Sequence, residues 1–133
     1  MKIALIQINP VIGDFPANSR KIVERVSEAR DRGCRLAILP ELVLPGYPPQ
    51  DLLERESFRA DHDRALARLV TELPDIDVLF GCIVRREEGK GKRLYNSAVA
   101  VRGSRIVFRA DKRLLPSYDV FDETRYFEPG SMP

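Results

Sequence analysis

The distribution of apolar residues predicts alternating strands and helices in the first half of the chain. Residues 2–9 place apolar side chains on both alternating faces, which is typical of a strand buried on both sides. After a turn, residues 19–31 repeat apolar side chains at helical spacing, and Gly33 is a common C-terminal stop for a helix. The short apolar run 36–39 predicts a second strand, parallel to the first. This β-α-β order indicates an α/β layered domain.

A proline-rich loop separates this unit from a second helical region and three further strands. Four prolines and one glycine in residues 40–49 predict the loop. Helix resumes near Asp51, and residues 57–72 predict a longer helix whose apolar side chains lie on one face. Glycine-containing turns at 88–91 and 102–104 connect three apolar segments, which are therefore expected to pair as antiparallel neighbours. The expected strands are 77–84, 94–101 and 105–110.

The predicted sheet is mixed, and nothing in the composition divides the chain into separate domains. A length of 133 residues suits one hydrophobic core. Beyond Lys112 the sequence predicts a long loop rich in proline, tyrosine and acidic residues. Residues 128–133 form a predicted turn with no element after it. We therefore expect residues 1–133 to be part of a domain.

Charge balance and hydropathy exclude several classes of function. Acidic and basic residues nearly cancel, and the net charge of +2 argues against a dedicated nucleic-acid binder, which normally carries a basic stripe. No apolar run approaches the roughly 20 residues that a membrane-spanning helix needs. The first residues lack the layout of a signal peptide. We expect a cytoplasmic protein with no membrane and no nucleic-acid partner.

The supply of cysteine and histidine limits the chemistry available within the chain. Cys34 and Cys82 show no metal-ligand spacing and no disulfide framework. Cys82 lies in an apolar strand and Cys34 at a helix-to-strand junction, so both are expected to be structural. His62, the only histidine, lies in a polar stretch and is predicted to be exposed to solvent. Ser-His-Asp or Cys-His catalysis and a multi-histidine metal site are therefore not expected.

Glu41 and Lys112 each follow a predicted strand and could meet at one edge of the sheet. Glu41 stands in an apolar run directly after the strand 36–39, where ligands gather in open α/β sheets. Isolating a charge among apolar groups is costly unless a partner stabilises it. Lys112 follows the strand 105–110 and could be that partner, or could stabilise an oxyanion. A solvent-facing loop carboxylate and a surface lysine are the simpler readings of the two residues taken singly.

Glu123, Tyr47 and Tyr118 lie in the two loops that flank these positions. A second carboxylate near the first would help to make a general base, although an exposed loop acid is the simpler account of Glu123. Tyr47 and Tyr118 occupy proline-bearing loops and could line a pocket. Aromatic side chains in such loops more often pack against the domain surface. Position alone leaves both alternatives open for all three residues.

The segments around these residues resemble the nitrilase superfamily of carbon–nitrogen hydrolases. Four short pieces carry the resemblance, at residues 2–7, 36–42, 46–47 and 95–98. Two longer motifs, GYPPQDLL at 46–53 and LPSYDVFDETRYFEPG at 115–130, narrow it to the glutaminase domain of glutamine-dependent NAD+ synthetases. The resemblance runs from end to end of the chain. It implies an α/β fold, namely the first half of an α-β-β-α sandwich with a mixed sheet flanked by helices.

In that family a Cys-Glu-Lys triad hydrolyses an amide through a thioester. The resemblance implies Glu41 as the general base and Lys112 as the residue that stabilises the tetrahedral oxyanion. It implies Glu123 as a second carboxylate beside the lysine, and Tyr118 with Tyr47 as residues that shape a glutamine pocket. The implied reaction is hydrolysis of glutamine, which supplies ammonia for ATP-dependent amidation of deamido-NAD+.

The resemblance also implies parts that lie outside these residues. The family's nucleophilic cysteine would follow Pro133, as would the second half of the sandwich and a synthetase domain that uses ATP and Mg2+. Residues 1–133 themselves are expected to hold no cofactor and no metal, and the full-length enzyme is expected to be a homo-oligomer. By themselves they are expected to be an inactive fragment that exposes apolar strand edges and faces.

Two alternative functions remain open from the sequence. The first is a stand-alone nitrilase-type amidohydrolase that acts on another carbon–nitrogen bond. A C-terminal extension with an ATP-pyrophosphatase phosphate loop would favour the synthetase over this amidohydrolase. The second is a non-catalytic module that assembles with a partner chain. Self-association without thiol reactivity would favour that module.

Overall fold

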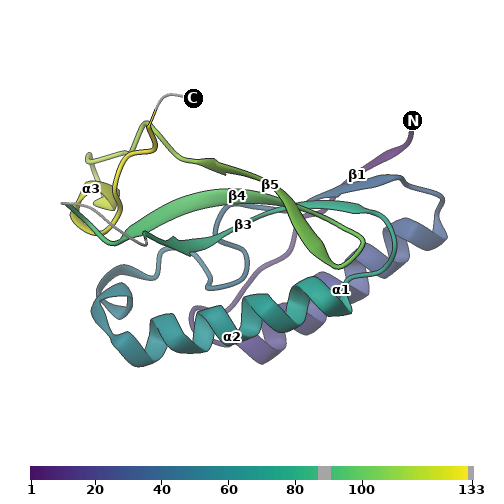
Figure 1. The fold of residues 1–133 in the computed structure, drawn as a ribbon, viewed down its shortest axis with the longest axis horizontal. Helices are drawn as coiled ribbons and strands as arrows, with labels where there is room; N and C mark the ends of the chain where they lie inside the picture. Colours follow the sequence, from purple (N-terminus) through teal and green to yellow (C-terminus); the bar gives the residue numbers. More distant parts are fainter. Residues whose placement is uncertain (87–90, 132–133) are drawn as a thin grey trace.

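The protein folds as a single mixed sheet whose strand order follows the chain (Figure 1). The computed structural model describes residues 1–86 and 91–131, so most of the turn predicted at 88–91 lies outside the described residues. Two parallel pairings join the first three strands, and two antiparallel pairings add the last two, which confirms the predicted mixed sheet. The strands are β1 (Ile3–Leu5), β2 (Leu36–Ile38), β3 (Asp77–Arg85), β4 (Leu94–Arg102) and β5 (Arg105–Asp111).

Two long helices, α1 (Phe15–Asp31) and α2 (Glu56–Glu72), lie side by side on one face of the sheet (Figure 1). α1 begins earlier than predicted because Asp14 caps it, accepting a hydrogen bond from the Ala17 amide at 3.0 Å. The 3-10 helix η1 (Gln50–Glu54) and the short α3 (Glu123–Tyr126) complete the elements. None of the helices in the described ranges is long and apolar enough to cross a membrane.

The sheet face away from α1 and α2 carries an apolar row that crosses all five strands. Register aligns Leu5 with Ile38, Leu79, Ala100 and Phe108, one residue from each strand. The ends of the row are open to solvent, with Leu5 79% and Phe108 58% exposed. The prediction that the first strand is buried on both faces is therefore wrong, because the helices cover only one side. The expected exposure of an apolar sheet face is confirmed for the described residues.

The single histidine is buried, which corrects the prediction that it faces solvent. His62 is 0% exposed, and its Nε2 accepts a hydrogen bond from the Ile83 amide at 3.2 Å. β2 pairs with β3 only as far as Leu79, so the β3 amides that face this edge beyond that point need other acceptors, while the opposite edge stays paired with β4. His62 supplies one of them. A sequence signal was present, since Phe58, His62, Ala65 and Leu69 fall on one face of α2 and all are buried.

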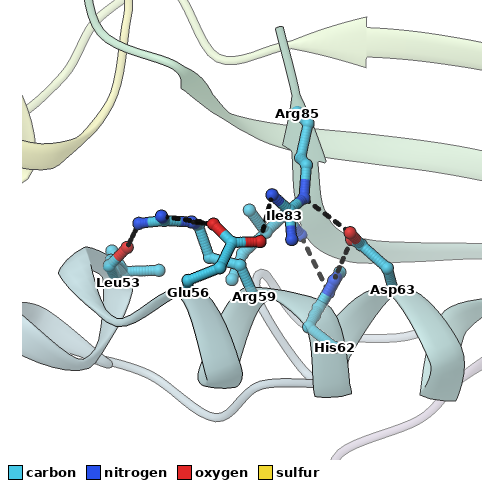
Figure 2. A network of polar contacts seen from close by, with 7 residues as sticks. All are labelled: Leu53, Glu56, Arg59, His62, Asp63, Ile83 and Arg85. Carbon is cyan, nitrogen blue, oxygen red and sulfur yellow. Dashed lines mark hydrogen bonds and ion pairs between the residues drawn. The ribbon is translucent and has the colours of Figure 1, made fainter.

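Figure 2 shows how a chain of polar contacts extends from this histidine to η1. Because Nε2 accepts, the ring proton of neutral His62 belongs on Nδ1, which lies 3.5 Å from Asp63 Oδ1. Arg85 of β3 donates from Nε to Asp63 Oδ2 at 2.6 Å. Further ion pairs and hydrogen bonds continue through Arg85, Glu56 and Arg59 to the Leu53 carbonyl oxygen. The network therefore connects α2 to both β3 and η1.

Replacing His62 with alanine is expected to destabilise the fold by about 2–4 kcal/mol, through a cavity and an unsatisfied buried Ile83 amide. Urea unfolding followed by circular dichroism measures the loss. The matched control is Asp63→Asn, which removes a half-exposed ion pair and should cost less than about 1 kcal/mol. If His62→Ala lowers the free energy of unfolding by no more than the control does, the role of His62 as acceptor for the Ile83 amide would be contradicted.

Candidate active site

Glu41 is positioned by a close approach between its own backbone and β3. It follows β2 in the chain, and the Pro40 carbonyl oxygen accepts a hydrogen bond from the Gly81 amide at 3.1 Å. A Cβ at Gly81 would lie 2.6 Å from Glu41 Cα and 2.3 Å from the Leu42 nitrogen. Leu42 itself is fully buried with φ +45°, a strained conformation for a leucine. Glycine at position 81 is therefore what lets the Glu41 loop cross the strand.

Lys112 reaches Glu41 from the end of β5. Its amide donates to the Asn96 carbonyl oxygen at 2.8 Å, and its own carbonyl accepts from the Gly130 amide at 2.9 Å. With its backbone held on both sides, Lys112 donates from Nζ to Glu41 Oε1 at 2.8 Å. The two residues are 71 positions apart in the sequence. The structure thus brings the two predicted residues together as an ion pair.

Glu123 is a second carboxylate on the same lysine and is not an exposed loop acid. It opens α3, and its side chain is 6% exposed. Glu123 lies 3.1 Å from Lys112 Nζ, and its Oε1 accepts a hydrogen bond from the Tyr47 hydroxyl at 2.9 Å. The Glu123 amide donates to the Pro116 carbonyl oxygen, which folds the segment after β5 back over the site. Lys112 therefore bonds to carboxylates from two distant segments of the chain.

The surroundings of Lys112 and Tyr47 keep both groups protonated. Partial burial of Lys112 opposes its charge, but the hydrogen bonds to Glu41 and Glu123 outweigh burial and raise the pKa of the ammonium above its usual value. Burial also raises the pKa of Tyr47, and the hydrogen bond to Glu123 raises it further. The lysine is therefore a stable positive charge, and the Tyr47 hydroxyl is a lasting hydrogen-bond donor.

Asn96 of β4 belongs to the cluster, although the sequence reasoning gave it no role. It is 3% exposed, and its Nδ2 donates to Glu41 Oε1 at 2.5 Å and reaches Glu123 Oε2 at 3.5 Å. The available signal was the polar pair Asn96 and Ser97 in the mostly apolar segment 94–101, which was predicted to pair with the strand before Lys112. Such a residue in a central strand is costly unless it finds polar partners.

A cleft of about 400 Å³ opens beside Glu41 and Lys112 and is also lined by Gly81 and Asn96. The predicted substrate-binding tyrosines lie outside it. Tyr47 contacts Glu123 and lines a separate hollow of about 230 Å³ beside η1. Tyr118 is 69% exposed and lines a neighbouring hollow that it shares with Lys112. Their predicted part in glutamine binding remains a prediction.

Neither cysteine of the chain is placed to act as a nucleophile at this cluster. Cys34 and Cys82 are both buried and free. Burial raises the pKa of the Cys82 thiol to about 12, which leaves almost no thiolate at neutral pH. In the part of the chain that the structure describes, no group of three or more His, Cys, Asp or Glu residues could hold a metal ion. The chemistry of the described cluster is therefore that of two carboxylates and an ammonium.

The sequence matches a known family over nearly its whole length. The carbon–nitrogen hydrolase profile covers residues 2–133. The chain belongs to the carbon–nitrogen hydrolase family. Among its relatives is the glutamine-dependent NAD(+) synthetase of Thermotoga maritima, 41% identical over 132 residues, which are 98% of this chain and 22% of that protein.

Solved structures of other carbon–nitrogen hydrolases share the fold. The glutamine-dependent NAD+ synthetase from Acinetobacter baumannii, in complex with ADP, has a TM-score of 0.89 at 35% identity and covers 98% of this chain and 24% of its own. A variant of the nitrilase-superfamily amidase from Nesterenkonia sp. AN1 has a TM-score of 0.84 at 25% identity, over 100% of this chain and 49% of its own. That variant shows covalent addition of the acetamide moiety of fluoroacetamide at its active-site cysteine. The comparisons confirm the nitrilase-like fold, and the chain spans less than a quarter of the synthetases it matches.

Substituting Gly81 by alanine should separate Glu41 from Lys112, because the added methyl group would collide with the backbone at Glu41 and Leu42. Loss of the Glu41 hydrogen bond is expected to lower the pKa of Lys112 toward its usual value, which NMR titration of the lysine side chain would measure. Gly103→Ala is the control: its φ of +54° makes the change a strain on the β4–β5 turn itself, but an added Cβ meets nothing within 4 Å there, so the Lys112 titration should stay unchanged. An unshifted Lys112 titration in folded Gly81→Ala protein would rule out this account of how Glu41 is placed.

Proposed function

We propose that residues 1–133 supply the general base and the oxyanion-stabilising ammonium of a thiol-dependent amide hydrolase. The observation that carries the proposal is the ion pair between Glu41 and Lys112 at the edge of an open cleft. The nucleophile is a cysteine from outside residues 1–133, since both cysteines within them are buried. The covalent adduct at the active-site cysteine of the Nesterenkonia amidase, a protein of the same fold, supports a thiol nucleophile.

In the proposed reaction Glu41 takes the thiol proton, and the thiolate attacks the amide carbon. The carbonyl oxygen gains negative charge in the tetrahedral intermediate, and the Lys112 ammonium stabilises it. Glu41 then delivers the proton to the leaving nitrogen, so that ammonia departs and a thioester remains. Glu41 next takes a proton from water as the water oxygen attacks the thioester carbon. When the carbon–sulfur bond breaks, Glu41 returns this proton to the departing thiolate, which releases the acid and restores the free thiol. Both described hydrogen bonds to the Glu41 carboxylate end on Oε1, which leaves Oε2 as the oxygen to carry the proton.

Glu123 and the tyrosines have supporting roles in this proposal. Glu123 is a second acceptor for the Lys112 ammonium, and Tyr47 fixes the Glu123 carboxylate by donating to it. Tyr118, exposed beside Lys112, would contribute to the substrate pocket once the surrounding segments are in place. Because two acceptors hold the Lys112 ammonium in one position, it can stabilise the developing negative charge on the carbonyl oxygen without first reorganising.

Glutamine is the proposed substrate, because relatives with about 40% identity are glutamine-dependent NAD(+) synthetases. The ammonia released would serve the amidation of deamido-NAD+, with ATP and Mg2+ bound outside residues 1–133 in a homo-oligomeric enzyme. A stand-alone amidase is the second candidate, supported by the fit of the whole chain onto about half of the Nesterenkonia amidase. A non-catalytic assembly module would instead use the apolar sheet face. Thiol labelling separates the two enzymes from the module.

Labelling of the native protein with an electrophilic glutamine analogue tests the proposal. Mass spectrometry should find the adduct on a cysteine outside residues 1–133, and Glu41→Gln or Lys112→Met should slow labelling by about 100-fold or more. Glu24→Gln, an exposed carboxylate on α1, is the matched control and should label at the rate of the unsubstituted protein. An adduct on Cys34 or Cys82 would contradict the assignment. Labelling by small amide analogues in place of the glutamine analogue would favour the stand-alone amidase.

A further inference from the structure

Asn96 is in contact with every member of the charged cluster. Its side-chain amide donates to Glu41 Oε1 and lies within hydrogen-bonding distance of Glu123 Oε2. Its backbone carbonyl accepts the Lys112 amide. The residue lies on β4, paired with Ile83 of β3 on one side and bonded to Lys112 just past β5 on the other, and it is 3% exposed. Its position is therefore set by the sheet and not by a loop.

The cluster needs a neutral donor because its charges do not balance. Two carboxylates bond to one ammonium, so one negative charge is left over in a partly buried site. Carboxylates that share a partner repel each other, and the repulsion grows as the surroundings become less polar. A second lysine or arginine would neutralise the excess charge but would also compete with Lys112 for both acceptors. An amide contributes two N–H groups and no net charge.

We propose that Asn96 is a positioning residue that holds Glu41 and Glu123 against Lys112 by donating to both carboxylates. The proposal rests on the proposed function, because its kinetic consequence requires Glu41 to be the base. The carboxylates also fix the amide, since its nitrogen faces both of them and its oxygen would be repelled. The hydrogen bond to Oε1 limits rotation of the Glu41 carboxylate, so that Oε2 keeps one orientation beside the cleft that Glu41 lines. Small displacements of a reacting group cost about 100-fold in rate, which is why such a restraint matters.

Asn96 acts through Glu41 and not on the substrate, so its replacement should change turnover more than binding. Asn96→Leu removes both N–H groups while keeping the number and branching of the side-chain heavy atoms. It is expected to lower kcat for glutamine hydrolysis by about 10- to 100-fold, with KM changed less than about threefold. Asn96→Asp keeps the shape but adds a third carboxylate. The acidic limb of the pH–rate profile should then move to higher pH by about one unit, because the cluster takes up a proton more readily.

The experiment compares both variants with Val99→Ala in the native protein, across the pH range in which each stays folded. Val99 is fully buried on β4, pairs with Phe80 of β3, and by strand alternation faces away from Asn96. Its truncation weakens the same strand but should keep kcat within about twofold and leave the pH profile in place, since no reacting geometry changes. A kcat for folded Asn96→Leu within about twofold of the unsubstituted protein would overturn the proposal.

The side-chain amide NMR signals of Asn96 give a second readout that does not depend on turnover. Glu41→Gln and Glu123→Gln should each shift these signals, since each removes a charged acceptor. Signals that move in neither variant would also overturn the proposal. If the unsubstituted protein does not hydrolyse glutamine while the amide signals move in both variants, the proposed function fails and the bridging position of Asn96 stands.

Discussion

The arrangement of the site depends on one ammonium bonded to two carboxylates. A lysine charge that is partly withdrawn from water is stable only beside negative partners, and carboxylates near each other are stable only with a cation between them. Glu41, Lys112 and Glu123 satisfy one another, with contacts of 2.8 and 3.1 Å at Lys112 Nζ. Each comes from a different part of the chain, so the contacts also fix the loop after β2 and the segment after β5 against the sheet.

The early end of β2 explains both the Glu41 loop and the buried histidine. β3 continues beyond its pairing with β2, and every freed backbone amide there must find another acceptor. The Gly81 amide donates to the Pro40 carbonyl oxygen, and this hydrogen bond holds the Glu41 loop against the strand. The Ile83 amide donates to His62 Nε2. Hydrogen bonding of the backbone amides on this one edge of β3 therefore both places the proposed base and anchors α2.

The local sequence pattern predicted most helices and strands. It did not predict the environment of residues whose contacts are distant in the sequence. Periodicity and glycine turns located both long helices, the parallel pairing of β1 with β2 and the antiparallel pairings, because helical spacing, the β-α-β order and short turns are read from local sequence. The parallel pairing of β2 with β3 was not predicted. The exposure of His62 was mispredicted because the polar residues around it in α2 hid its place on the buried face. Glu123 and Asn96 could not be placed by pattern, since each is defined by contacts with Glu41 and Lys112 across the sheet. Family resemblance brought Glu41 and Lys112 into one hypothesis where position alone left each ambiguous.

The cleft and the uncovered apolar row lie on connected parts of the sheet, which links the environment of the base to whatever covers that face. Leu79 and Gly81 line the cleft with Glu41, and Leu79 also belongs to the row that runs to Phe108. The Glu41 side chain is 44% exposed, so water reaches the carboxylate and weakens its interactions. A segment packed over the apolar row would remove this water while burying the row. Burial of the row would then strengthen the contacts among Glu41, Asn96 and Lys112. The packing of that segment on the sheet would therefore stabilise both the fold and the charged site.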